Sequence, residues 1–202
     1  MAKPRTAEQR ALAIVRKTGI LRPRDLDREG IARTYLQRLA RRGLLERAGR
    51  GLYRLSSADL TEHHGLAAAS KLVPNGVVCL LSALQFHDLT TQAPHEVWLA
   101  IDRLGWRPRQ TTPPLRIVRF SGRALTEGVK VHTIEGVRVP IYSPAKSVAD
   151  CFKYRNKLGL DVAIEALRDY RRRHPRGVDE LWRYARICRV ANVMRPYMEA
   201  QA

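Results

Sequence analysis

The sequence predicts an α+β protein in which a small helical region with a β-hairpin precedes a larger domain, a mainly antiparallel sheet flanked by helices. Residues 6–43 contain three short helical patterns, each closed by a glycine, and residues 44–55 have the pattern of a hairpin. Residues 95–143 contain four runs rich in branched and aromatic side chains, with helical patterns before and after them. We expect one domain at 1–57 and a second at 58–202.

The first two helices have recognisable start and stop signals. Thr6, with Gln9 three residues later, forms a capping box, and the apolar positions that follow end at Gly19. Pro23 occupies a favoured first-turn position, and Gly30 ends a second helix of about two turns. A tight connection between the two helices is therefore expected.

The third helix, expected from Ala32 to Gly43, has one apolar side and one basic side. Its apolar residues recur at three- and four-residue steps, and the opposite arc holds no acidic side chain. Such an arc is typical of a solvated surface, and it also suits contact with nucleic acid. The arc consists of Arg33, Thr34, Gln37, Arg38 and Arg41, with Arg42 at its edge.

The hairpin places an arginine between two glycines. Gly49 and Gly51 permit the positive φ angles of a tight turn, so Arg50 is held out in solvent, flanked by Arg47 and Arg54. Three helices followed at once by a hairpin is the order of a winged helix-turn-helix. In that fold the third helix enters the DNA major groove, and here the wing arginine would reach a neighbouring minor groove or phosphates.

Composition favours a polyanionic partner such as nucleic acid. The chain has 37 Lys and Arg against 19 Asp and Glu, a formal charge of +18. Residues 1–55 hold 15 of these basic residues and 5 of the acidic ones, a net +10 in about a quarter of the chain. No secretory signal or membrane span is recognised, and the three cysteines form no CxxC pair. We expect a cytoplasmic protein with reduced thiols and no membrane partner.

The second domain is expected to contain helices on both sides of four strands. One of its helices begins after Ser143, which would cap it, and has Lys146 four residues before Asp150. That spacing predicts a modest ion pair on the face opposite the apolar stripe Ala145, Val148, Ala149 and Phe152. The helices are expected within 61–73, 77–89 (after a short strand), 143–155, 160–173 and 178–200, and the strands at 95–102, 115–120, 129–134 and 137–143, the last two joined by a turn at Glu135–Gly136.

Motifs of catalysis, metal binding or nucleotide binding were not found. No Asp or Glu is followed two positions later by Lys, as in many metal-dependent nucleases, and the glycine-rich phosphate loops are missing. Adjacent His63 and His64 would point about 100° apart on a helix. We expect no enzyme, no cofactor and no metal site. The carboxylates considered as magnesium ligands were Asp88, Glu96, Asp102 and Asp150, and the residues considered for nucleophilic catalysis were Ser82, His87 and Asp88.

A basic run lies near the end of the helix expected at 160–173. It suits additional contacts with DNA phosphates, and it equally suits stabilisation of the negative end of a helix dipole. Both interpretations stay open. The run consists of Arg171, Arg172, Arg173 and, after the helix, Arg176.

Three segments together resemble the AbiEi family of antitoxin-type transcriptional regulators from bacterial abortive-infection, type IV toxin-antitoxin systems. They are LQRLARRGLLERAGRGLYRL (36–55), LLSALQFHDLTTQAPHEVWLAI (80–101) and YSPAKSVADCFKYRNKLGLDVAIEALRDY (142–170). The first is common among winged helices, whereas the second and third in this order are more specific.

The resemblance implies a repressor whose winged helix binds inverted repeats in its own promoter, with a cooperative dimer on the DNA, and whose second domain is needed for antitoxicity in phage defence. The implied functional partner is a nucleotidyltransferase-like toxin, countered without a stable complex. The resemblance supplies no catalytic residue, and the DNA-binding role that it implies falls on the arc of the third helix and on Arg50. Two alternatives remain: a nuclease targeted by its winged helix, and an RNA-binding module that protects the target of a toxin.

Overall fold

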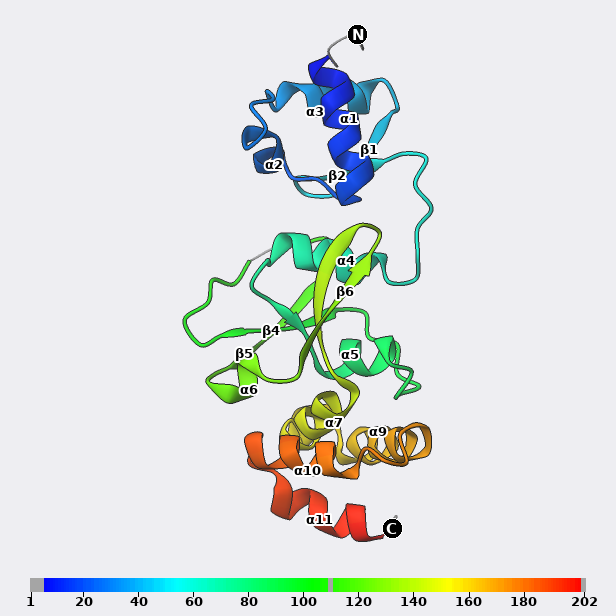
Figure 1. The fold of residues 1–202 in the computed structure, drawn as a ribbon, viewed down its shortest axis with the longest axis vertical. Helices are drawn as coiled ribbons and strands as arrows, with labels where there is room; N and C mark the ends of the chain where they lie inside the picture. Colours follow the sequence, from blue (N-terminus) through cyan, green and yellow to red (C-terminus); the bar gives the residue numbers. More distant parts are fainter. Residues whose placement is uncertain (1–5, 109–110, 201–202) are drawn as a thin grey trace. The chain divides into compact units, whose positions relative to one another are not determined.

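A computed structural model describes residues 6–108 and 111–200 (Figure 1). Residues 1–5 lie outside the described part. They belong to the N-terminal stretch in which no secretory signal was recognised. The chain divides into two compact units, called here the first and the second unit. The first unit consists of Met1–Pro74, Pro108–Pro114 and His132–Val139, and the second of Asn75–Arg107, Leu115–Val131 and Pro140–Ala202.

The first unit begins with the predicted winged helix-turn-helix. Helices α1 (Ala7–Thr18), α2 (Pro23–Asp27) and α3 (Thr34–Arg41) precede the antiparallel strands β1 (Leu45–Gly49) and β2 (Leu52–Leu55). The capping box is present, since the Thr6 hydroxyl accepts from the Gln9 amide at 3.2 Å and the Gln9 side chain accepts from the Thr6 amide at 3.0 Å. A buried cluster holds these elements together: Ala11, Val15, Leu21, Leu26, Ile31, Leu36, Leu39, Leu45 and Tyr53.

The start of α3 differs from the prediction by two residues. The amides of Tyr35 and Leu36 donate to the carbonyls of Ala32 and Arg33, each only three residues back. Such bonds form a tighter turn than an α-helix, so α3 begins at Thr34.

The α+β class is confirmed, but the predicted strand directions are wrong in part. Strands β3 (Val77–Val78), β4 (Val97–Asp102), β5 (Leu115–Phe120), β6 (Val129–Ile134) and β7 (Val137–Tyr142) form one sheet in the order β5-β4-β3-β7-β6. Pairs β4–β5 and β3–β7 are parallel, whereas β3–β4 is antiparallel, which makes the sheet mixed. The long connection at 103–114 explains the parallel β4–β5 pair, because it is long enough to return the chain to the same end of the sheet.

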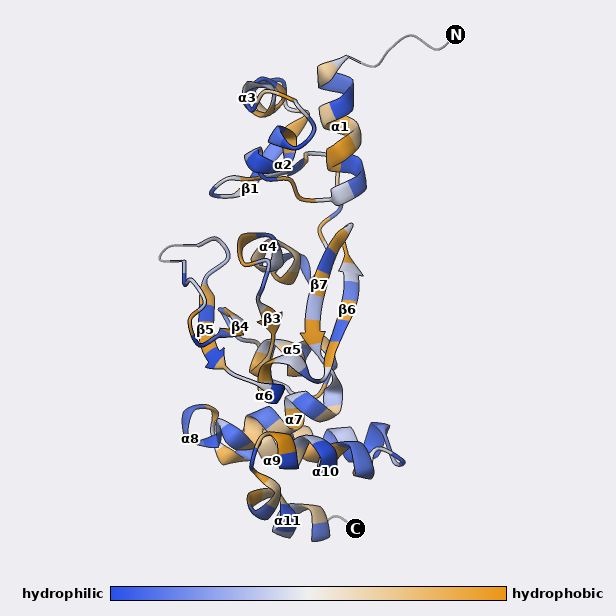
Figure 2. Cartoon of the chain, turned by 60° about the vertical axis from the view of Figure 1, so that its left-hand side comes forward, coloured by the Kyte–Doolittle hydropathy of each residue, from blue (hydrophilic) through white to orange (hydrophobic). Residues whose placement is uncertain are grey.

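The helices of the later chain appear where they were predicted, with two short additions. The predicted last helix is split, because Arg189 has a φ of +60°. In Figure 2, α9 and α10 carry both hydrophobic and hydrophilic residues, as partly exposed helices do. The helices are α4 (His64–Leu72), α5 (Leu80–Phe86), α6 (Arg123–Thr126), α7 (Pro144–Lys153), α8 (Arg155–Leu158), α9 (Leu160–Arg173), α10 (Val178–Ile187) and α11 (Ala191–Glu199).

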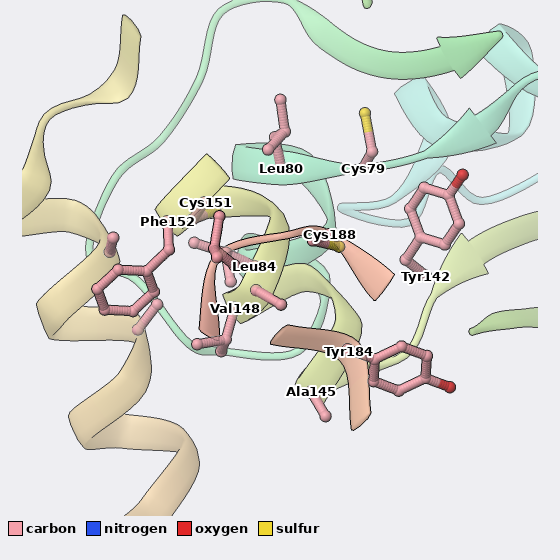
Figure 3. Packing of buried hydrophobic residues seen from close by; sticks show 14 of the residues in the cluster. Cys79, Leu80, Leu84, Tyr142, Ala145, Val148, Cys151, Phe152, Tyr184 and Cys188 are labelled. Atoms are coloured by element: carbon pink, nitrogen blue, oxygen red, sulfur yellow. The ribbon is translucent and has the colours of Figure 1, made fainter. Parts of the chain in front are cut away.

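Helix α7 lies at the centre of the second unit. It packs against α5, α9, α10 and α11, and every residue from Ala145 to Phe152 is buried. The Ser143 hydroxyl caps it as predicted, accepting from the Lys146 amide at 3.4 Å. Figure 3 shows Cys151, Cys188 and Tyr142 within this core.

The predicted surface ion pair on α7 is wrong in its location. Lys146 and Asp150 have no exposed side-chain area, and the Lys146 ammonium lies 2.5 Å from Asp150 Oδ2. The Cys188 thiol donates to Asp150 Oδ1 at 3.2 Å, and the ammonium lies 4.1 Å from the centre of the Tyr142 ring. Burial raises the pKa of the Asp150 carboxyl, and the neighbouring Lys146 opposes that shift.

Candidate nucleic-acid interface

Helix α3 presents one polar face to solvent. Leu36 and Leu39 are buried against the rest of the winged helix, and Tyr35 and Ala40 are half-buried. The predicted arc is exposed along its whole length, and it contains no carboxylate. Its exposed members are Arg33, Thr34, Gln37, Arg38 and Arg41, followed by Arg42.

Two arginines of this arc are already ion-paired within the protein. Arg33, which precedes the helix, makes a two-pronged contact with Asp27 at the end of α2, with Nε 2.9 Å from Oδ1 and Nη2 2.5 Å from Oδ2. The hydrogen bonds from Arg33 hold the pKa of the Asp27 carboxyl below its ordinary value. Arg42 pairs with Glu8 of α1. These two ion pairs link the two ends of α3 to α2 and α1.

The residues of α3 itself, between Arg33 and Arg42, form no such ion pairs with the described residues. The guanidinium carbon of Arg38 lies 5.4 Å from the centre of the Tyr35 ring, a cation–π contact that leaves the donors of Arg38 exposed. Thr34, Gln37 and Arg41 make no side-chain hydrogen bond or ion pair with any residue in the described part of the chain. Their donors and acceptors are available to an external partner.

The wing has Arg50 at its tip. Strands β1 and β2 pair with Leu45 opposite Leu55 and Arg47 opposite Tyr53, and Arg50 is exposed in the turn between them. Gly51 has a φ of +70°, which confirms the conformational role predicted for it.

The conformational role predicted for Gly49 is wrong, because its φ is not positive. Gly49 is instead required by space, since a Cβ there would lie 2.6 Å from the carbonyl oxygen of Thr112.

The two arginines beside the wing tip differ. Arg54 is largely buried, pairs with Glu46 on the opposite strand and donates to the Ala58 carbonyl at 2.8 Å. Arg47 is exposed and has no ion pair among the described residues, so it belongs with Arg50 on the outer surface of the wing. The sequence alone can indicate this difference. Side chains alternate between the two faces of a strand, and this alternation places Arg47 and Arg54 on different faces of the hairpin.

Later segments of the first unit contact the start of α2 and the end of α1, where Gly136 lies against Lys17, Thr18 and Gly19. Arg22, at the start of α2, donates to the Lys71 carbonyl of α4 at 2.7 Å. Glu135 in the β6–β7 turn accepts from the Thr61 amide at 2.9 Å and lies 2.7 Å from Nδ1 of His64. The scaffold of α3 therefore extends beyond the winged helix itself.

The basic run at the end of α9 is engaged with nearby acids. Arg172 lies 3.0 Å from Asp169, and Arg173 lies 3.4 Å from Asp88. Arg171 is half-buried, and Arg176 is exposed beyond the helix. Arg171, Arg172 and Arg173 occupy the last turn of α9, where cations interact favourably with the helix dipole.

The carboxylates considered as metal ligands have separate partners. Asp88 pairs with Arg173, Glu96 lies 3.2 Å from Arg116, Asp102 accepts from the Leu104 amide, and Asp150 pairs with Lys146. Within residues 6–108 and 111–200, no three His, Cys, Asp or Glu side chains are grouped so as to hold a metal ion. The same residues include no helix with the length and apolar character that crossing a membrane requires.

The residues considered for nucleophilic catalysis are also engaged elsewhere. The Ser82 hydroxyl accepts from the Trp98 amide at 3.0 Å, and Nε2 of His87 lies 2.8 Å from the Tyr142 carbonyl oxygen.

Three helices, a wing and an exposed basic third helix define a winged helix-turn-helix of the kind found in DNA-binding regulators. Residues 9–56 match the model of a family described as transcriptional regulator, AbiEi antitoxin. The resemblance inferred from the sequence is thus confirmed for this part of the chain, which contains the first of the three segments on which it rested. No curated protein was found to match the chain.

Proposed function

We propose that the protein is a DNA-binding transcriptional repressor that recognises inverted repeats in its own promoter. The observation that carries the proposal is the exposed face of α3, which has no carboxylate. Thr34, Gln37, Arg38 and Arg41 form no side-chain hydrogen bond or ion pair with the described residues there, and Arg38 contacts only the Tyr35 ring. The match of residues 9–56 to a family of transcriptional regulators supports it.

In the proposed complex α3 enters the major groove. Arg38 and Arg41 carry guanidinium forks that fit the O6 and N7 acceptors of guanine, and Gln37 fits the N6 and N7 edge of adenine. Arg50 at the tip of the wing contacts the adjacent minor groove or phosphates. Inverted repeats place two copies about one helical turn apart, which allows cooperative binding as a dimer on the DNA.

Arg33 and Arg42 take part in a different way. Each must break or share its ion pair with Asp27 or Glu8 to reach DNA. We assign them to phosphates at the two ends of α3, where they also keep the helix in position. Arg171, Arg172, Arg173 and Arg176 are proposed as additional phosphate contacts, with stabilisation of the end of α9 as the competing role.

We further infer that the chain serves as the antitoxin of a type IV toxin-antitoxin system in the cytoplasm, in defence against phage. Its functional partner would be a nucleotidyltransferase-like toxin with which it forms no stable complex. The separate engagement of the residues considered for catalysis supports action by binding rather than by catalysis, without a cofactor or metal.

The proposal is tested by measuring affinity for the DNA upstream of the gene and for a scrambled duplex of equal length, at about 150 mM salt, where non-specific attraction is partly screened. We expect a preference of about a hundredfold or more for the upstream DNA. Gln37→Ala and Arg38→Ala should each weaken this binding by about 1–3 kcal/mol, because each removes a base contact. Arg195→Ala, an exposed helical arginine of the second unit, is the control and should bind like the wild type.

Equal affinity for both duplexes, or unchanged affinity in the two α3 variants, would refute the assignment of α3. Growth of cells that also express the adjacent gene tests the antitoxin part separately. A chain with Arg38→Ala is expected to bind the promoter more weakly and still protect those cells. Failure of the wild-type chain to protect them would remove the antitoxin role.

A further inference from the structure

A short loop after β4 exposes two large apolar side chains. Leu104 is 92% exposed and Trp106 is 73% exposed, the highest values among the large apolar side chains of the described residues. The other two tryptophans, Trp98 and Trp182, are buried and half-buried. A side chain as large as tryptophan normally hides most of its surface, so this exposure requires an explanation.

The backbone of this loop is held in place by its neighbours. Arg119 of β5 donates to the carbonyls of Asp102 and Gly105, each at 3.1 Å, and also to that of Arg103. The Leu104 amide donates to the Asp102 carboxylate at 2.9 Å. These bonds fix the turn from which Leu104 and Trp106 project.

The charges around the two apolar side chains are mainly positive. Arg103 and Arg107 are exposed and form no ion pair with a residue that the structure describes. The carboxylate of Asp102, at the start of the loop, already accepts a hydrogen bond from the Leu104 amide. The loop thus combines an aromatic plane, an aliphatic side chain and two cations that have no ion pair among the described residues.

We propose that this loop, Asp102–Arg107, binds single-stranded nucleic acid, with Trp106 stacking on an unpaired base and Arg103 and Arg107 contacting the adjacent phosphates. Aromatic side chains flanked by cations are the means by which proteins hold single strands without strong sequence preference. Two side chains on an open loop offer too small a patch for a stable protein partner, whereas one base fits a single indole ring. The proposed site uses no residue of α3 and does not depend on promoter binding.

The test uses the full-length protein and two single-stranded probes of about 12 nucleotides, an oligothymidylate and an abasic strand with the same phosphates. The wild-type protein should bind the oligothymidylate at least about fivefold more tightly than the abasic strand, and binding should quench tryptophan fluorescence. Trp106→Ala should weaken binding to the oligothymidylate by about 5- to 150-fold and remove the preference for bases. Trp106→Phe, which keeps an aromatic ring, should retain most of the affinity.

Two controls separate this site from the rest of the protein. Leu160→Ala removes another exposed apolar side chain of the second unit and should leave the affinity unchanged. Trp106→Ala should bind duplex promoter DNA like the wild type, so this inference and the proposed function can fail independently. An oligouridylate probe shows whether RNA is bound by the same loop.

Equal wild-type affinity for the two strands would overturn the proposal, because the bases would then contribute nothing. Unchanged affinity in Trp106→Ala would overturn it as well. So would displacement of the oligothymidylate by a polyglutamate peptide of equal charge at equal concentration, since the loop would then recognise acidic protein segments.

Discussion

At the level of single residues, Lys146 and Asp150 form the most constrained charge pair in the described chain. Both side chains are fully buried, and they contact each other, the Cys188 thiol and the rings of Tyr142 and Phe120. Lys146→Met should lower the free energy of unfolding by roughly 3–5 kcal/mol, because it leaves a buried carboxylate without a counter-ion. Urea unfolding followed by circular dichroism measures this loss.

The double variant Lys146→Met with Asp150→Leu provides the matched comparison. It removes both charges from the core, so it should recover most of the stability that the single variant loses. A double variant as unstable as Lys146→Met alone would show that packing, rather than the unpaired charge, causes the loss.

The sequence predicted the partners of this pair but not its burial. Spacing of four residues brings Lys146 and Asp150 together on any helix. Whether that face meets solvent depends on other parts of the chain, because the pair contacts Cys188, which follows α10, and the rings of Tyr142 and Phe120 on two strands. The positions of Arg33 and Arg42 at the ends of the third helix were predicted in the same way. Their ion pairs were not, because the partners Asp27 and Glu8 lie on other elements.

At the level of elements, the end of α1 meets the β6–β7 turn at Gly19. This glycine has φ +67° and ψ −66°, and the Ile20 amide donates to the Thr18 carbonyl at 2.7 Å, which makes a γ-turn. A Cβ on Gly19 would lie 1.5 Å from the Glu135 carbonyl oxygen. An alanine here must therefore displace one of the two backbones.

Gly19→Ala should lower the free energy of unfolding at least twice as much as Gly43→Ala. Gly43 has a similar φ of +71°, but nothing lies within 4 Å of a Cβ there. Conformational strain alone costs Gly43→Ala about 1–2 kcal/mol, and the clash adds to this at Gly19. Thermal unfolding of both variants gives the comparison, and equal losses would mean that the contact with Glu135 is unimportant.

Elements with strong local signals were predicted well, and their long-range pairing was not. The capping box of α1 and the Glu135–Gly136 turn, with φ of +49° and +76°, depend on a few adjacent residues. The parallel pairing of β4 and β5 depends on the path of the long loop at 103–114, for which the residues give no direct signal. The close approach of Gly49 to Thr112 was hidden for the same reason.

At the level of the whole molecule, the winged helix depends on distant parts of the chain. Contacts from Lys71, Thr112 and Glu135 hold α2, the wing and the end of α1. No pattern within residues 1–57 indicates these contacts, because their partners follow later in the sequence. The domain boundary at residue 57 stays a prediction, and variants of the full-length chain are the appropriate test of DNA binding.

The salt dependence of promoter binding distinguishes the two roles of the basic run on α9. Each phosphate contact on B-DNA contributes about 0.9 to the slope of log affinity against log salt. Arg50→Gln should therefore reduce the slope by about 0.9, since Arg50 is exposed at the wing tip. For the run, Arg172 and Arg173 have acidic partners and Arg171 is half-buried, which leaves Arg176 as the contact that costs no internal interaction. A variant in which all four arginines of the run are replaced by Gln should thus change the slope by no more than about 1. A reduction of about 3 or more would show that the ion pairs open and that the whole run binds DNA.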